Sequence, residues 1–187
     1  MNADSVQWVV ANKDVITSWT AILAVIASAA SLVIAAASMR MQRAHYRKTV
    51  LPLGSISLGD YENHLFVRLR NDGVGPMIVN GISVHKLSSG DEVGSALIDF
   101  MPDGLHWETF VNDISGRVFA PGKDIDLISI RGHESDPEFV RARYQIRESL
   151  SKLSVRANYR SIYGDIGFAE RPLDWFGRHL AADGAVE

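Results

Sequence analysis

Residues 15–39 read VITSWTAILAVIASAASLVIAAASM, and this stretch decides the architecture of the chain. It contains 25 residues and no charged side chain. A helix of this length extends roughly 37 Å, which is enough to cross a hydrocarbon core of about 30 Å. A cleaved signal peptide fits poorly, because the apolar run is too long, no basic segment opens it and basic residues follow it. We therefore predict a transmembrane helix over residues 15–39, preceded by a short extracytoplasmic N-terminus of residues 1–14.

The flanks of this helix differ in charge, and the difference predicts its orientation. The juxtamembrane linker, residues 40–50, carries Arg40, Arg43, Arg47 and Lys48, whereas the N-terminal flank has only Lys13 as a basic residue. The positive-inside rule places the basic flank in the cytoplasm. We expect a single-pass protein of the bacterial inner membrane, with its N-terminus outside and its C-terminal domain cytoplasmic. The basic flank either contacts anionic lipid headgroups or serves only as a stop-transfer signal.

One stripe of the predicted helix consists of small residues. Its members follow a four-three spacing, which places them on a single face: Thr17, Ala21, Ala24, Ser28, Ser31, Ala35 and Ser38. Transmembrane helices associate through the close backbone approach that small residues permit. The stripe predicts a helix–helix contact, either between copies of this chain or with a partner membrane protein. Because Ala and Ser are frequent in this segment, a chance arrangement is the alternative.

Residues 51–168 predict a mainly β domain that contains one α-helix. In HLFVRLRN, residues 64–71, the apolar Leu65, Val67 and Leu69 alternate with polar positions, as in a half-buried strand. The predicted strands cover residues 51–58, 64–71, 76–87 and 95–100, then 118–130 around a Pro-Gly turn, and 153–168 around a two-residue hairpin turn at Gly164-Asp165. The inserted helix begins after Asp136, which can cap it, with Pro137 in its first turn. Short strands between Gly/Pro turns favour an antiparallel sandwich, followed by a C-terminal tail of residues 169–187.

Three segments of this domain resemble a known pattern. NDGVGPMIVNGISV at 71–84, FAPGKDIDL at 119–127 and VRANYRSIYGDIGF at 155–168 are similar to small bacterial membrane-anchored proteins, most of them uncharacterised. In those proteins an N-x-G-x-G-P turn, a Pro-Gly turn and a closing Tyr…Gly hairpin belong to an immunoglobulin-like β-sandwich behind N-terminal membrane helices. The resemblance implies that fold and a bacterial origin. Its motifs consist of turn chemistry and imply no activity.

The composition excludes several kinds of site. The chain has no cysteine, which excludes disulfides, a thiol nucleophile and Cys-based zinc sites. Residues 49–187 carry 14 basic and 20 acidic side chains, so nucleic acid is not an expected partner. No histidine pair has the spacing of a helical zinc site, and His133-Glu134 before Asp136 is better explained by helix capping. We expect no cofactor, no metal and no enzymatic activity, and we interpret the alternating Asp124 and Asp126 as a solvated strand face.

The stretch 101–116 is the longest irregular segment, and it supplies the candidate contact site for a partner. His106, Trp107 and Phe110 lie in it, and exposed aromatic loops often bind other molecules. The alternative is that Trp107 and Phe110 close the open end of the sandwich, as large aromatic residues usually do.

These observations lead to two functional hypotheses. In the first, the chain is a non-enzymatic interaction or sensor module that assembles through its helix in the bilayer and presents a cytoplasmic sandwich to a protein or a small signal. In the second, it is a membrane-perturbing effector, for example of a bacterial antiphage defence system, that acts by oligomerising in the bilayer. A membrane-potential dye separates the two, because an inert anchor leaves the potential intact.

Overall fold

The computed structural model describes residues 11–180, apart from the side chains of Ala44, Arg47, Lys48 and His179. The chain divides into two compact units, Met1–Lys48 and Thr49–Glu187. Most of the predicted N-terminus, residues 1–14, and the end of the predicted tail, residues 181–187, lie outside the described residues.

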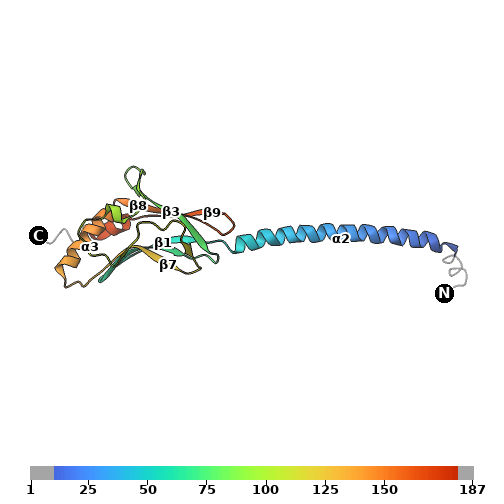
Figure 1. Cartoon of the computed structure of the whole chain (residues 1–187), viewed down its shortest axis with the longest axis horizontal. Coiled ribbons are helices and arrows are strands. Elements are labelled where there is room, and N and C mark those ends of the chain that lie inside the picture. The colour runs from blue at the N-terminus through green and yellow to red at the C-terminus, as the bar shows by residue number, and fades with distance from the viewer. Residues whose placement is uncertain (1–10, 181–187) are drawn as a thin grey trace. The chain divides into compact units, whose positions relative to one another are not determined.

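The first unit is dominated by one helix, α2 (Lys13–Thr49), which is coloured blue to cyan in Figure 1. Its segment Lys13–Arg43 is long and apolar enough to cross a membrane, and none of its most apolar window is buried. The bulky side chains of Trp19, Leu23 and Val25 are exposed along it. By length, composition and exposure, this segment is a candidate membrane span.

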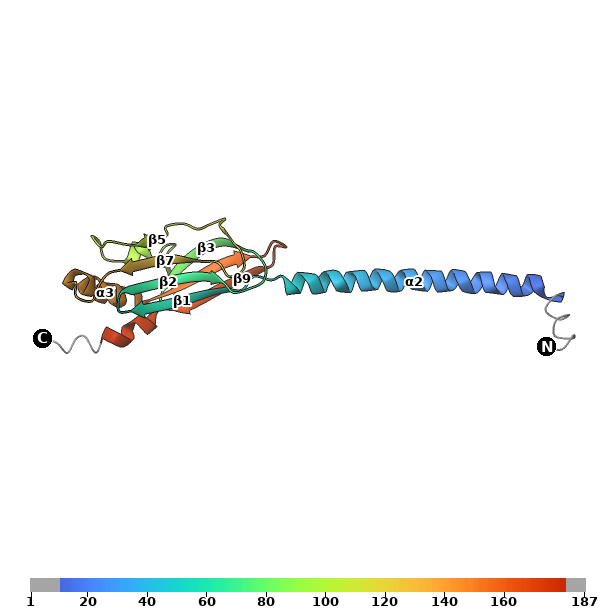
Figure 2. The same ribbon diagram turned by 90° about the horizontal axis from the view of Figure 1, so that it is seen from below.

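The second unit consists of two antiparallel sheets that form two layers (Figure 2). The first sheet has the order β1-β2-β7-β5, and the second has the order β4-β3-β8-β9, with β6 paired to β3. The first sheet comprises β1 (Gly54–Tyr61), β2 (His64–Asn71), β5 (Thr109–Phe110) and β7 (Asp124–Arg131). The second comprises β3 (Met77–Lys86), β4 (Glu92–Gly94), β6 (Val118–Phe119), β8 (Leu153–Arg160) and β9 (Ile166–Pro172). The mainly β prediction for this unit is confirmed.

The core lies between the two layers and is built by strand alternation. Leu65, Val67 and Leu69 of β2 are fully buried, as the alternating sequence predicts. From the opposite layer, Val155 and Ala157 of β8 are equally buried. Both inner faces contribute to one continuous apolar cluster, which holds the two sheets together.

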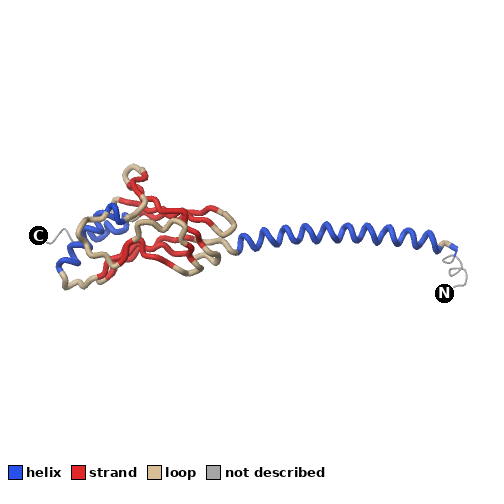
Figure 3. Tube along the Cα trace, viewed as in Figure 1, coloured by secondary structure: helices blue, strands red, loops and turns tan. Residues whose placement is uncertain are grey.

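Two helices lie together at one end of the sheets, at the left in Figures 1 and 3. The first is α3 (Pro137–Leu150), whose N-cap Asp136 accepts a hydrogen bond from the backbone N–H of Glu138, as predicted. The second is the 3₁₀ helix η2 (Asp174–His179). Phe176 and the preceding Leu173 are fully buried. The packed domain therefore continues past residue 168, and the predicted C-terminal tail packs on it through Leu173 and Phe176.

The turn at residues 71–76 is organised by the side chain of Asn71, which is buried. Its amide oxygen accepts hydrogen bonds from the backbone N–H groups of Leu53 and Gly73, and its amide nitrogen donates to the carbonyls of Gly75 and Phe119. A side chain at Gly75 would collide with the backbone of Val50, which explains the glycine. The N-x-G-x-G-P pattern thus connects three segments: the linker before β1, the turn itself and β6.

Four local predictions differ from the structure. The first strand runs over Gly54–Tyr61 in place of 51–58, because residues 51–53 are hydrogen-bonded to the 71–76 turn. Residues 95–100 do not form a strand: Ala96 and Leu97 are buried in an irregular segment that continues into a 3₁₀ turn, η1 (Ile98–Phe100). The hairpin between β8 and β9 has a five-residue loop, 161–165, in place of a two-residue turn. The side chain of Ser161 fixes this loop by accepting hydrogen bonds from the N–H groups of Tyr163 and Asp165. Finally, the irregular segment contains the short strand β5, which pairs with β7.

Candidate functional site

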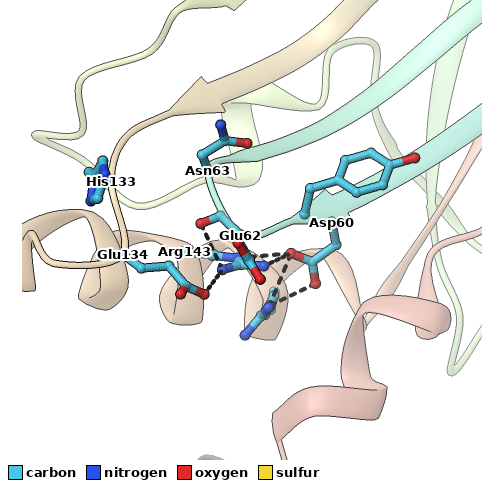
Figure 4. Close-up of a pocket in the computed structure, with 8 residues that line it drawn as sticks. Asp60, Glu62, Asn63, His133, Glu134 and Arg143 are labelled. Carbon is cyan, nitrogen blue, oxygen red and sulfur yellow. Dashed lines mark hydrogen bonds and ion pairs between the residues drawn. The ribbon is translucent and has the colours of Figure 1, made fainter.

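The most distinctive polar cluster joins α3 to the hairpin between β1 and β2 (Figure 4). Asp60, near the end of β1, has a fully buried side chain. Its carboxylate accepts hydrogen bonds from Nε of Arg143 and Nε of Arg147, both at 2.9 Å. Arg143 also donates to the carbonyl of Glu62 at 3.2 Å. One carboxylate therefore holds two guanidinium groups from a helix that follows it by more than eighty residues.

Local structure explains how the two arginines come together. Residues four apart in a helix lie on the same face, so Arg143 and Arg147 project from α3 in the same direction. Phe139 and Ile146 bury the adjacent face of α3 against the sheets, which fixes the rotation of the helix about its axis. The cap at Asp136 fixes where the helix begins.

A cavity of about 560 Å³ lies beside this cluster and is lined by Tyr61, Asn63, His133 and Glu134 as well as the ion-paired residues. Glu134 approaches Arg143 at 3.7 Å, which adds a second carboxylate to the same side of the cavity. Glu62 also lines the cavity, so three carboxylates face two guanidinium groups, and the cavity offers no excess positive charge to an anionic ligand. The arrangement acts as an electrostatic clamp that fastens α3 to the first sheet.

A second polar group lies on the outer face of the first sheet. His64 and Arg131 pair across β2 and β7, and Glu108 directly precedes β5. The Glu108 carboxylate accepts hydrogen bonds from Ser129 Oγ at 3.3 Å and Arg131 Nε at 3.1 Å. His64 Nε2 is 3.7 Å from the Glu108 carboxylate, is buried and has no hydrogen-bond partner among the described residues. Burial, followed by the positive charge of Arg131, lowers the pKa of His64 below its usual 6.5.

The predicted contact residues of the 101–116 segment are separated by the structure. Trp107 is half-buried and packs against the core, in agreement with the alternative that it closes the sandwich. Phe110 lies on β5 and remains 49% exposed. His106 is exposed and lines a cavity of about 520 Å³ between the loop at residues 104–106 and α3, together with Arg141 and Gln145. His106 and Phe110 are thus available to a partner, whereas Trp107 is largely part of the packing.

The carboxylates on β7 are ion-paired. The Asp126 carboxylate accepts hydrogen bonds from Nε and Nη2 of Arg68 on the neighbouring strand β2. The Asp124 carboxylate lies 3.6 Å from the same guanidinium group. Arg68 also stacks over the ring of Phe66 at 4.5 Å. Asp124 and Asp126 do share one outward face, as alternation predicts, but cross-strand pairing with Arg68 accounts for them better than solvation alone.

The seven small residues of the predicted stripe all lie on α2. The hydroxyls of Thr17 and Ser31 donate to carbonyls of their own helix, those of Lys13 and Ala27, at 2.8 Å each. These two polar groups are therefore satisfied without a partner helix, and their contribution to a contact is their small volume. In the predicted basic flank, Arg40 and Arg43 are exposed on α2, while the side chains of Arg47 and Lys48 lie outside the description.

Within residues 11–180, no group of three or more metal-ligating side chains comes together. His133 Nδ1 lies 2.9 Å from Ser135 Oγ, so its ring belongs to the turn that leads into the Asp136 cap. The ion pairs of Asp60 were not predicted from the sequence. Their signal there is the four-residue spacing of Arg143 and Arg147, together with Asp60 as the one charged residue of its strand.

The chain was also compared with known proteins. No protein-family model matches it, and no curated protein matches it either.

Proposed function

We propose that this chain is a membrane-anchored, non-enzymatic interaction module of the bacterial inner membrane. In this proposal α2 spans the bilayer and associates with a second helix, and the β unit is presented to a cytoplasmic protein or a small signal. The observation that carries the proposal is the exposed apolar segment Lys13–Arg43, which is covalently joined to a separate compact unit.

The strand order supports an immunoglobulin-like sandwich as the presented domain. In constant-type immunoglobulin domains one sheet has the order A-B-E-D and the other contains C, F and G. When the strands are lettered along the chain, β1-β2-β7-β5 corresponds to A-B-E-D, and β3-β8-β9 corresponds to C-F-G, with β4 as an additional edge strand next to C. Domains of this architecture commonly serve in recognition, which fits the proposed role.

The surface we propose for the partner is the α3 end of the sandwich. Val140 and Tyr144 are exposed on α3, and Arg141 lies between them on the chain. His106 borders the adjoining cavity, which extends the surface to the predicted contact loop. The clamp at Asp60 keeps α3 in place, so this surface is preorganised, which reduces the entropy lost when a partner binds.

The full-length chain in detergent tests the proposal. Native mass spectrometry should show an oligomer, or the chain should co-purify with one membrane partner in fixed stoichiometry. Tyr144→Ala together with His106→Ala should weaken retention of the cytoplasmic partner and leave helix association unchanged. A protein that washes off membranes at alkaline pH, or one that remains a monomer without a stoichiometric partner, would contradict it.

A further inference from the structure

The end of the sandwich where the chain arrives from α2 has a surface that the proposed function does not use. We call it the linker end, and it comprises residues 50–53, the 71–76 turn, β6 and the loop between β8 and β9. The linker is fastened to it, because Asp72 N–H donates to the carbonyl of Leu53 at 2.8 Å and Gly75 N–H donates to that of Leu51. The linker end is therefore the part of the domain to which the chain from the anchor is attached.

The covalent connection limits how far this end can lie from a bilayer that holds α2. Residues 40–49 add about 15 Å of helix beyond the apolar stretch, and residues 50–53, which lead from this helix to β1, span at most about 14 Å. The headgroup layer on each side of a bilayer occupies roughly 5–8 Å. At full extension these two segments total about 29 Å, so the linker end lies at most about 21–24 Å beyond the headgroup layer, within reach of the lipid surface. The α3 end lies at the opposite end of the strands.

Exposed apolar side chains concentrate at this end. Ile78 pairs with both Val118 and Arg160, and Arg160 pairs with Ile166, so Val118 and Ile166 belong to one row across the outer face of the second sheet. Ile166 is 84% exposed, and Phe168, two residues later on β9, is 58% exposed. The other exposed members are Val74 in the 71–76 turn and Ile162 and Tyr163 in the β8–β9 loop. Exposed apolar side chains gathered at one end of a domain mark a candidate contact with a protein or a membrane.

Three cations border the linker end. Its own two carboxylates, Asp72 and Asp165, are engaged within the domain: Asp72 pairs with Arg70 at 2.8 Å, and Asp165 accepts a hydrogen bond from Ser161 Oγ at 3.0 Å. Arg117, Lys123 and Arg160 are exposed there, and none of them forms an ion pair within residues 11–180. They border the apolar row: Arg117 precedes Val118 on the chain, and Arg160 pairs with Ile166 across β8 and β9. Lys123 lies beside the 71–76 turn, because its backbone carbonyl accepts a hydrogen bond from the N–H of Asn71. Residues 49–187 as a whole carry six more acidic than basic side chains, so these free cations stand out from the rest of the domain. Apolar side chains bordered by Lys and Arg are typical of surfaces that lie in the interface of anionic bilayers.

We infer that the linker end docks on the lipid surface. Val74, Val118, Ile162, Tyr163, Ile166 and Phe168 enter the headgroup region, and Arg117, Lys123 and Arg160 contact anionic headgroups. This inference rests on the proposed membrane anchoring of α2. It adds an orientation to the proposed function, because docking by the linker end turns the α3 end toward the cytoplasm. A second copy of the chain is the competing occupant, and the continuity of this surface with the anchor favours lipid.

The absence of cysteine from the chain makes the test direct, since any introduced cysteine is the only one available for labelling. Ile166→Cys, labelled with an environment-sensitive fluorophore, is placed in the full-length chain in nanodiscs that hold one chain each. The discs contain three parts phosphatidylcholine to one part phosphatidylglycerol, with a nitroxide on a fraction of the headgroups. A second set of discs carries the nitroxide on the acyl chains and is used for the label at residue 26. Val140→Cys on α3, 47% exposed, is the matched control far from the linker end. Ile26→Cys within α2 reports whether the helix is inserted.

Docking predicts that the label at residue 166 is quenched roughly twofold more than the label at residue 140, and that its emission shifts to the blue. Adding Lys123→Glu and Arg160→Glu should reduce the quenching at residue 166 in these discs and change little in discs of phosphatidylcholine alone. Equal quenching at residues 166 and 140, with the label at residue 26 quenched by acyl-chain nitroxides, would overturn docking and leave the anchor intact. A blue shift found only in discs that hold two chains would assign the surface to a second copy. An unquenched label at residue 26 would instead contradict the proposed anchoring.

Discussion

Asp60 shows how much one side chain contributes to the order of the α3 end. It is a fully buried carboxylate between two guanidinium groups that are themselves about nine-tenths buried. A buried charge is tolerated only when it is paired and hydrogen-bonded, and here both partners come from one helix. The position of α3 therefore depends on this carboxylate as well as on the apolar contacts of Phe139 and Ile146.

Replacing Asp60 by Ala should destabilise the domain by about 3–5 kcal/mol, because it leaves two buried guanidinium groups without their counter-charge. Chemical denaturation of the full-length chain in detergent, followed by circular dichroism, measures the loss. Glu170→Ala is the matched control, since its pair with Arg156 is 38% exposed on each side and is worth less than about 1 kcal/mol. Equal losses for the two variants would show that Asp60 is not a clamp.

His64 predicts a dependence of stability on pH. Its pKa is lowered in the folded state, so the unfolded chain binds more protons between that lowered value and about 6.5. The free energy of unfolding should therefore fall as the pH drops from about 7.5 through 6.5 and level off below the folded pKa. His64→Gln should remove part of this decrease, as measured by thermal unfolding at a series of pH values. The exposed His133→Gln is the control, and an unchanged pH profile in His64→Gln would exclude His64 as the source.

At the scale of residues, the sequence predicts local roles better than distant ones. The cap at Asp136 could be predicted because a capping side chain acts on the residues that follow it directly. The role of Asp60 could not, because its partners lie more than eighty positions away and only the packing of α3 brings them together. Trp107 illustrates the same limit, since its type fits both a binding loop and a core position and only its surroundings decide.

Among the elements, α2 carries the prediction on which assembly depends. Ala24→Leu or Ser28→Leu adds bulk on the small-residue stripe, where two backbones would approach each other. The helix should still insert, because Leu favours insertion, but association in a membrane two-hybrid assay or by cross-linking should decrease. Ser28→Ala should be nearly silent, since interhelical polar contacts in membranes average about 0.6 kcal/mol.

The controls for this prediction lie off the stripe. Leu23→Ala and Ile26→Ala shorten exposed side chains of α2 outside it and should affect association less. If the Leu variants associate as well as the wild type, the stripe is an accident of composition.

Strand prediction succeeded where alternation was clear and failed where other contacts dominate. The strand at 64–71 was predicted to the residue, and the strand that begins at Leu153 was predicted with its correct start, because one face of each is buried throughout. The end of this second strand at Arg160 comes three residues before the predicted turn. Residues 95–100 have strand composition, but Phe100 packs against Gly94, where a Cβ would lie 2.7 Å from its ring, and the segment turns instead. The five-residue loop before β9 depends on hydrogen bonds to Ser161, a residue whose type alone does not indicate this role.

The orientation of the whole molecule is the prediction that decides where a partner would be found. A reporter that is active only in the cytoplasm should be active when fused after Glu187, because Arg40 to Lys48 follow the apolar stretch. The same fusion with a periplasm-dependent reporter should be inactive. The opposite pattern would move the β unit outside and refute both the localisation and a cytoplasmic partner.

The lengths of the edge strands affect how readily copies of this domain aggregate at high local concentration. Confinement to a membrane crowds the copies of a protein, and exposed sheet edges then favour strand-to-strand aggregation. On one side of the sandwich the edge strands β4 and β5 have only three and two residues, which leaves few unpaired backbone groups. On the other side the long edge strands β1 and β9 lie against each other, and β9 ends at Pro172. Crowded copies of this domain therefore have few edges through which they can polymerise.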